Sequence, residues 1–145
     1  MSGQMKYLIW FARILFGAWM VTNGLNHFVY LWPQPLGGLQ VSKEFTIALI
    51  DSHLFDLVKA VEVLAGVSAL TGLYAPLLMI VGLPVSFVVW YYGAVINHSA
   101  GGHGYVVLGT NLIICLGYWK NYKAIFTMRT QPREIAPAMA PAPAE

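Results

Sequence analysis

Long apolar stretches separated by short polar segments dominate this chain. Four of them approach the ~20 residues that a helix needs to cross a bilayer. They cover about residues 7–32, 54–74, 76–96 and 105–126. The pattern predicts an all-α protein, an integral membrane four-helix bundle formed by residues 1–128.

The composition supports a lipid environment for these helices. Hydrophobic residues make up 58% of the chain and charged residues 10%, against about 25% charged residues in an ordinary soluble domain. A soluble protein of this size could not cover such an apolar interior with so few polar side chains. The first stretch is too long for a signal peptide, contains Arg13 and lacks a small-x-small cleavage site, so we expect it to remain as a helix of the mature chain.

Two segments outside the four stretches have a different character. In the connection 33–53, the turn sequence "PQPLGG" precedes "SKEFTIALI", which predicts a short amphipathic helix at the outer surface. The alternative is a loop packed over the mouth of the bundle. Residues 129–145 are rich in proline and alanine and predict a disordered tail.

Lysine and arginine near the ends of the stretches predict the orientation in the membrane. Both termini are expected in the cytoplasm of a bacterial-type cell, with the protein crossing the inner membrane several times. The basic residues that indicate this are Lys6, Lys120, Lys123, Arg129 and Arg133. With this orientation all four histidines lie toward the outer side.

Ionisable residues inside the apolar stretches are candidates for function, because charge is costly in lipid. They are Arg13 in the first stretch and Lys59 and Glu62 in the second. At 1.5 Å per residue, Arg13 lies ~10 Å and Glu62 ~18 Å above the inner boundary, a gap that an arginine side chain spans. We therefore expect an Arg13–Glu62 ion pair with Lys59 beside it.

These residues admit two interpretations. One is a buried polar network that fixes helix register, and the other is a polar pocket, open to the outer face, that binds a quinone head group or relays protons. The predicted network comprises Arg13, Asn23, Lys59 and Glu62, and the candidate contacts with a quinone or a partner are Asn26, His27, His98 and Asn111.

The histidines also raise the question of a metal or haem. Candidate ligands are His27, His53, His98 and His103. A b-type haem needs two facing histidines, which His27 and His98 could supply, and zinc or copper favours three or four ligands. The loop "NHSAGGHG" contains no carboxylate to orient an imidazole, so we expect a tight turn there and no metal.

The segments "RILFGAWMVTNGLNHF" and "LVKAVEVLAGVSALTGLYAPLLMIVGLPV" resemble the DoxX-like family of small four-helix membrane proteins. The resemblance covers the first three stretches. Carried over by position, it implies recurrent polar residues at Arg13, Asn23, His27, Glu62 and His98. Some relatives are associated with thiosulfate:quinone oxidoreduction or with membrane-bound redox assemblies.

Several functions remain open at this point. The chain has a single cysteine, Cys115, no dinucleotide-binding fingerprint and no complete catalytic constellation, so whether it is an enzyme stays undecided. The leading hypothesis is a non-catalytic subunit or scaffold of a larger membrane complex of redox or respiratory type, with lipid and other subunits or a second copy as partners and no nucleic acid. The alternatives are a quinone-binding redox module, a haem or metal binder and a small-solute transporter.

Overall fold

The computed structural model describes residues 3–98 and 102–123, and these residues form helices and connections without a strand. The prediction of an all-α protein is confirmed. In chain order the helices are α1 (Gly3–Val29), α2 (Gln40–Asp51), α3 (Leu54–Thr71), α4 (Ala75–Tyr91), the π-helix η1 (Tyr92–Ile96), α5 (His103–Gly117) and α6 (Trp119–Tyr122).

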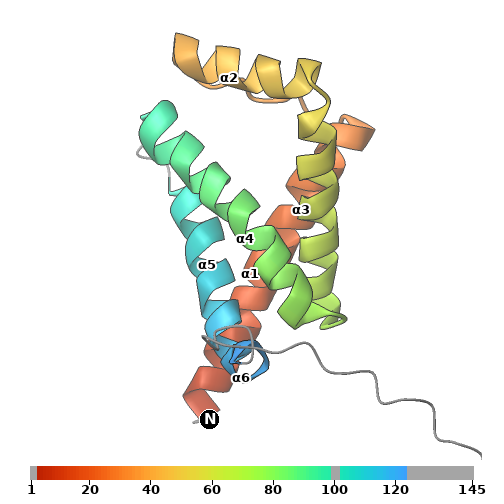
Figure 1. The fold of residues 1–145 in the computed structure, drawn as a ribbon, viewed down its shortest axis with the longest axis vertical. Coiled ribbons are helices and arrows are strands. Elements are labelled where there is room, and N and C mark those ends of the chain that lie inside the picture. Colours follow the sequence, from red (N-terminus) through yellow and green to blue (C-terminus); the bar gives the residue numbers. More distant parts are fainter. Residues whose placement is uncertain (1–2, 99–101, 124–145) are drawn as a thin grey trace, which may run out of the picture.

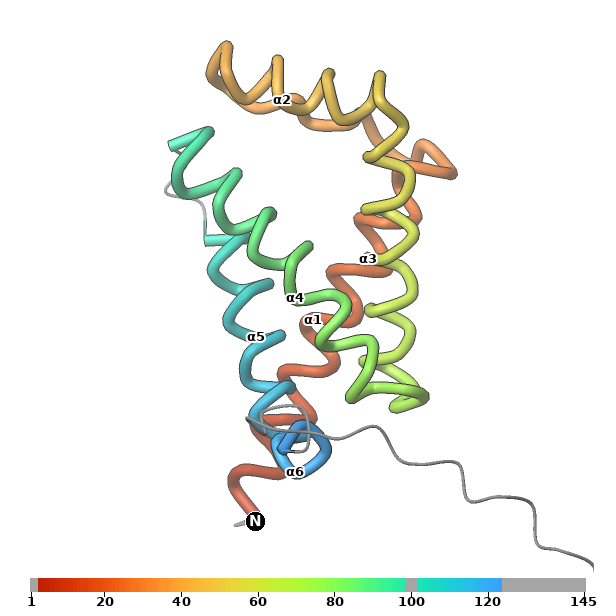
Figure 2. The backbone as a smooth tube through the Cα atoms, in the orientation of Figure 1, coloured from red at the N-terminus to blue at the C-terminus, as the bar shows by residue number. Residues whose placement is uncertain are grey.

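Four helices run lengthwise and α2 crosses one end of the molecule (Figure 1). Helix α1 packs against α3 and α5, and α4 packs against the same two helices. The N-terminus lies at the end opposite α2. Figure 2 shows α4 diverging from α3 toward α2, which spans the gap and contacts α3 and η1.

Glycines bring the backbones of α1 and α3 into direct contact. A Cβ atom on Gly66 would lie 2.8 Å from the Val21 amide nitrogen and 3.0 Å from the Gly17 carbonyl oxygen. One on Gly24 would lie 3.0 Å from the carbonyl oxygen of Lys59. Because no other residue fits this close approach, the glycines set the register between the two helices.

The ends of the first and fourth helices differ from the predicted boundaries. Helix α1 stops at Val29, before the predicted end at residue 32, because Tyr30 adopts a left-handed φ of 55°. Helix α5 stops at Gly117 and the short α6 follows it, whereas the sequence predicted one helix to residue 126. The predicted tail 129–145 lies outside the described residues.

The amphipathic segment predicted in the first long connection is the helix α2. Its buried side chains are polar, Ser42 and Thr46. The Asn97 side-chain oxygen accepts a hydrogen bond from the Gly38 amide at 2.8 Å, and the Ser42 hydroxyl lies 3.1 Å from the same oxygen. The Tyr92 hydroxyl donates to the Leu36 carbonyl at 3.0 Å. Helix α2 is therefore tied to η1 by hydrogen bonds more than by apolar packing.

Two helical segments of the described chain are long and apolar enough to cross a membrane. They are Gly3–Val29 and the continuous run Ala75–Ile96 formed by α4 and η1, and α5 is a shorter apolar helix. In the most apolar 18 residues of each of the two long segments, only 28% and 17% respectively are buried within the protein.

We predict that Gly66→Ala lowers the free energy of unfolding by about 1–3 kcal/mol, because the new methyl group forces α1 and α3 apart. Gly109→Ala is the matched control, since a Cβ atom there meets nothing within 4 Å; it should change stability by less than about 1 kcal/mol, in the stabilising direction. Unfolding in a denaturing detergent measures both. Equal effects of the two substitutions would contradict the close contact.

Candidate functional site

Ionisable residues occur at every third position from the residue before α3 to the middle of that helix. They are His53, Asp56, Lys59 and Glu62. Residues three apart in a helix lie on neighbouring parts of one face. Their side chains become steadily more buried toward the middle of the molecule, from an exposed fraction of 86% at His53 to 3% at Glu62. The row therefore connects the surface at the α2 end with the protein interior.

At the buried end of this row, Lys59 and Glu62 form an ion pair. The Lys59 Nζ atom donates to the Glu62 carboxylate at 2.8 Å, and the two side chains are 10% and 3% exposed. The ammonium group also lies 5.0 Å from the centre of the Phe55 ring. Each charge is compensated by the other, as a buried charge requires.

At the exposed end, Asp56 joins the two helices that carry the site. One of its carboxylate oxygens lies 2.6 Å from Nε2 of His27, at the end of α1, and the other lies 3.1 Å from Nδ1 of His53. The ring of His27 packs edge-on against the Phe55 ring, with centroids 5.1 Å apart. Phe55 thus lies against both His27 and Lys59.

The predicted Arg13–Glu62 ion pair is wrong. The Arg13 Nε atom donates to the Ala69 carbonyl at 2.7 Å, one of the last four carbonyls of α3, which lack partners within the helix. Glu62 lies beside Gly24 of α1. Gly24 is eleven residues from Arg13, which is ~16 Å along the helix axis. Arg13 therefore neutralises the negative end of the α3 dipole.

The depth estimate failed because α1 extends beyond the end of α3. The estimate assumed that Lys6 and Tyr74 lie at the same height along the helix axes. In the structure the last turn of α3 lies level with Arg13, and α1 continues for two to three turns past it toward the N-terminus (Figure 1). The structure divides the predicted network into an Arg13 cap and a separate Lys59–Glu62 pair.

A second polar cluster lies between α4 and α5. Asn111, fully buried, donates to the Ser86 hydroxyl at 2.8 Å, and Ser86 donates to the Gly82 carbonyl at 3.0 Å. The Cys115 thiol contacts the Asn111 side-chain oxygen at 3.4 Å. These bonds satisfy the buried polar atoms of the two helices and hold them together.

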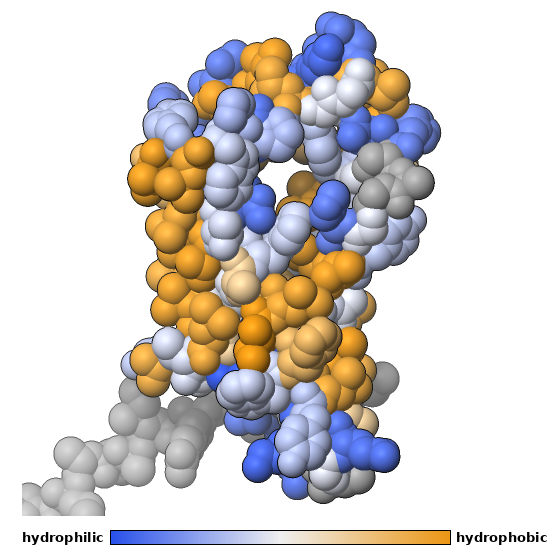
Figure 3. All heavy atoms as spheres, turned by 180° about the vertical axis from the view of Figure 1, so that it is seen from behind, coloured by the Kyte–Doolittle hydropathy of each residue, from blue (hydrophilic) through white to orange (hydrophobic). Residues whose placement is uncertain are grey.

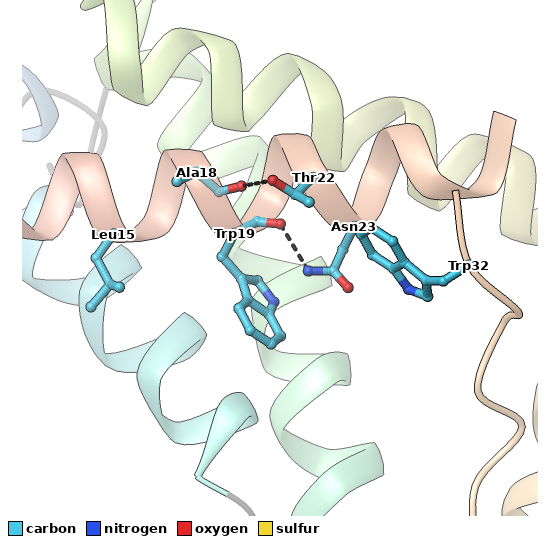
Figure 4. Close-up of a pocket in the computed structure, with 6 residues that line it drawn as sticks. All are labelled: Leu15, Ala18, Trp19, Thr22, Asn23 and Trp32. Carbon is cyan, nitrogen blue, oxygen red and sulfur yellow. Dashed lines mark hydrogen bonds between the residues drawn. The ribbon is translucent and has the colours of Figure 1, made fainter. Parts of the chain in front are cut away.

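Asn23 lines a groove of about 480 Å³ on the side of α1 that faces away from α3. The other lining residues are Leu15, Ala18, Trp19, Thr22 and Trp32. Figure 4 shows Trp19 and Asn23 projecting to the same side of the helix, with Trp32 folded back beside them. The amide group of Asn23 donates to the Trp19 carbonyl at 3.0 Å.

Two contacts hold the aromatic walls of this groove in place. The buried Asn26 side chain accepts a hydrogen bond from the Trp32 amide at 2.8 Å, which folds the chain back after α1. The Trp19 ring stacks on His103, with centroids 5.1 Å apart and planes 22° apart. Asn26 therefore positions a groove wall.

The two predicted haem ligands have different surroundings. His27 is bonded to Asp56, and His98 is exposed at the end of η1 with a left-handed φ of 47°. Among residues 3–98 and 102–123, no group of three His, Cys, Asp and Glu side chains is placed to hold a metal. Part of the loop between the last two histidines lies outside these residues.

Sequence reasoning missed the partners that complete these sites. The spacing of three from His53 to Glu62 was a usable signal for the row along α3. No comparable signal identified Trp19 and Trp32 as walls of one groove, because their contact depends on how the chain folds back after α1.

No family model matches this chain, and no curated protein and no solved structure matches it. The resemblance to DoxX-like proteins therefore stays a prediction, carried by the residues quoted for it.

We predict that Lys59 and Glu62 are energetically coupled while Arg13 and Glu62 are not. Lys59→Met or Glu62→Leu leaves one buried charge without its partner and should destabilise the protein by about 3–5 kcal/mol, whereas the double replacement should cost less than the sum of these two. Double-mutant cycles in detergent measure the coupling. An Arg13–Glu62 cycle is the control and should be additive; coupling in that cycle would contradict the assignment.

Proposed function

We propose that this chain is an integral membrane protein in which α1, α3, α4 and α5 cross the bilayer as a four-helix bundle. Support comes from the distribution of apolar surface. Figure 3 shows apolar residues covering the middle of the molecule, with polar residues gathered at the α2 end and at the N-terminal end. The core helix of a soluble protein is mostly buried, whereas α1 exposes most of its apolar side chains and α4 fully buries only a few of its own.

Within this framework the chain acts as a non-catalytic subunit or scaffold of a larger membrane complex, as the DoxX-like resemblance implies. The observation that carries this function is the internal pairing of its polar groups. Among the described residues, every buried side-chain nitrogen and oxygen has a hydrogen-bond partner. The polar interior thus supports a fixed helix arrangement, and the exposed apolar faces are available for lipid and for partner subunits.

We predict that the α2 end faces the outside of the cell and the N-terminus the cytoplasm, because the basic residues gather near the ends of the chain. In a Cys115→Ser background, a membrane-impermeant maleimide should label His98→Cys on intact cells. It should label Lys6→Cys only after permeabilisation. Both positions are exposed, so access to the reagent is set by the membrane. The reverse labelling pattern would contradict the orientation.

A quinone-binding module is the second candidate function, and the groove on α1 favours it. The indole rings of Trp19 and Trp32 offer flat faces for stacking a ring. The side-chain amide of Asn23 and the hydroxyl of Thr22 offer polar contacts beside them. Figure 4 shows the side chains of Trp19 and Asn23 on the side of α1 opposite α3, pointing toward α4 and α5.

We predict that the protein, extracted from its native membrane in mild detergent, migrates as a particle larger than one 16.0 kDa chain in its micelle. Native electrophoresis and mass analysis of the particle test this, and a monomeric particle would contradict the subunit proposal. Quinone extracted from the same particle tests the second candidate: Trp19→Ala should remove it. Trp10→Ala, on the same helix but outside the groove, should retain it.

A further inference from the structure

We propose that the row His53, Asp56, His27, Lys59 and Glu62 is a proton pathway that connects the solution at the α2 end with the buried Glu62 carboxylate. The observation behind this is a continuous fall in exposure along five ionisable groups that form two hydrogen-bonded sets, His53–Asp56–His27 and Lys59–Glu62. The exposed side-chain fractions are 86% for His53, 48% for Asp56, 14% for His27, 10% for Lys59 and 3% for Glu62.

The outer part of the pathway is already hydrogen-bonded. Asp56 lies within hydrogen-bonding distance of both histidines, at 3.1 Å and 2.6 Å. A proton that His53 takes from water can therefore pass through the Asp56 carboxyl group to Nε2 of His27 when that nitrogen is unprotonated. Imidazole is suited to this task because it gains and loses a proton near neutral pH. The His27 ring packs against Phe55, which also contacts the Lys59 ammonium group, so we assign His27 as the donor to the buried pair.

Phe55 lies between the outer part and the buried pair. Its ring is 5.1 Å from the His27 ring and 5.0 Å from the Lys59 ammonium group. Transfer past this ring adds one proton to the Lys59–Glu62 pair, which then holds an ammonium group and a neutral carboxyl group. An N–H bond of the His27 imidazolium breaks as the O–H bond of Glu62 forms, and His27 is left neutral.

The pathway ends at Glu62. Beyond it, the buried residues of α3 are Ala65, Gly66, Ser68 and Ala69, none of which ionises near neutral pH. The helices α4 and α5 contain no Asp, Glu, Lys or Arg, and the histidine of α5, His103, stacks on Trp19. On α2, Lys43, Glu44 and Asp51 are exposed. Glu62 therefore exchanges protons with one side of the molecule.

The experiment follows the protonation of Glu62 in the full-length protein in detergent after a rapid acid jump. The carboxylic-acid C=O infrared band of Glu62 is assigned by its loss in Glu62→Gln. In Asp56→Asn and His27→Phe the band should rise about tenfold more slowly, equivalent to a barrier about 1.4 kcal/mol higher. Asp51→Asn is the matched control, because it removes the same charge from the same end of the molecule, and its rate should equal that of the wild-type protein.

Asp56→Glu keeps a carboxylate in the row and should restore the rate, which separates proton transfer from a structural role of Asp56. If Asp56→Asn does not fold, His53→Phe, at the exposed end, should still slow the band. Equal rates in all variants, equal slowing by Asp51→Asn, or a Glu62 carboxylate that takes up no proton at any pH where the protein stays folded would overturn the proposal. Because the measurement needs no membrane, its outcome is independent of the proposed topology and subunit role.

Discussion

The backbone contact between α1 and α3 is the constraint on which the rest of the structure depends. Gly17, Gly24 and Gly66 remove the side chains that would separate the two helices. Once these backbones touch, the register of α1 against α3 has no freedom. That register sets which side chains meet at both ends of the pair: Arg13 reaches the last turn of α3, and His27 reaches Asp56 in its first turn.

The same contact explains where prediction from the sequence succeeded and where it failed. Helix content follows from the spacing of the apolar residues alone. The Arg13–Glu62 pair required a register, which the sequence does not contain, because it depends on how far α1 extends past the end of α3. The expected separation of Arg13 and Glu62 along the helix axis was ~8 Å and the observed one is ~16 Å, an error of about one and a half helical turns.

Other features depend on contacts that no local pattern encodes. The left-handed conformation of Tyr30 and the Asn26–Trp32 bond fold the chain back over α1 and build one wall of the groove. The end of α5 at Gly117 could not be predicted from hydropathy, since the apolar residues continue beyond it. The tie between α2 and η1 depends on Asn97 and Tyr92, residues more than 40 positions away from their partners in the chain.

The buried polar groups between α4 and α5 differ in kind from those between α1 and α3. Between α4 and α5 the buried polar groups are neutral. The Asn111 amide donates a hydrogen bond to the Ser86 hydroxyl, and no charge is buried. Between α1 and α3 the polar groups are ionisable, although a charge costs far more to bury than an amide. A purely structural network could have used neutral groups in both places. Ionisable side chains instead lie between α1 and α3, the two helices in glycine contact, and they run from exposed to buried. This arrangement is the strongest argument that this face does more than hold helices together.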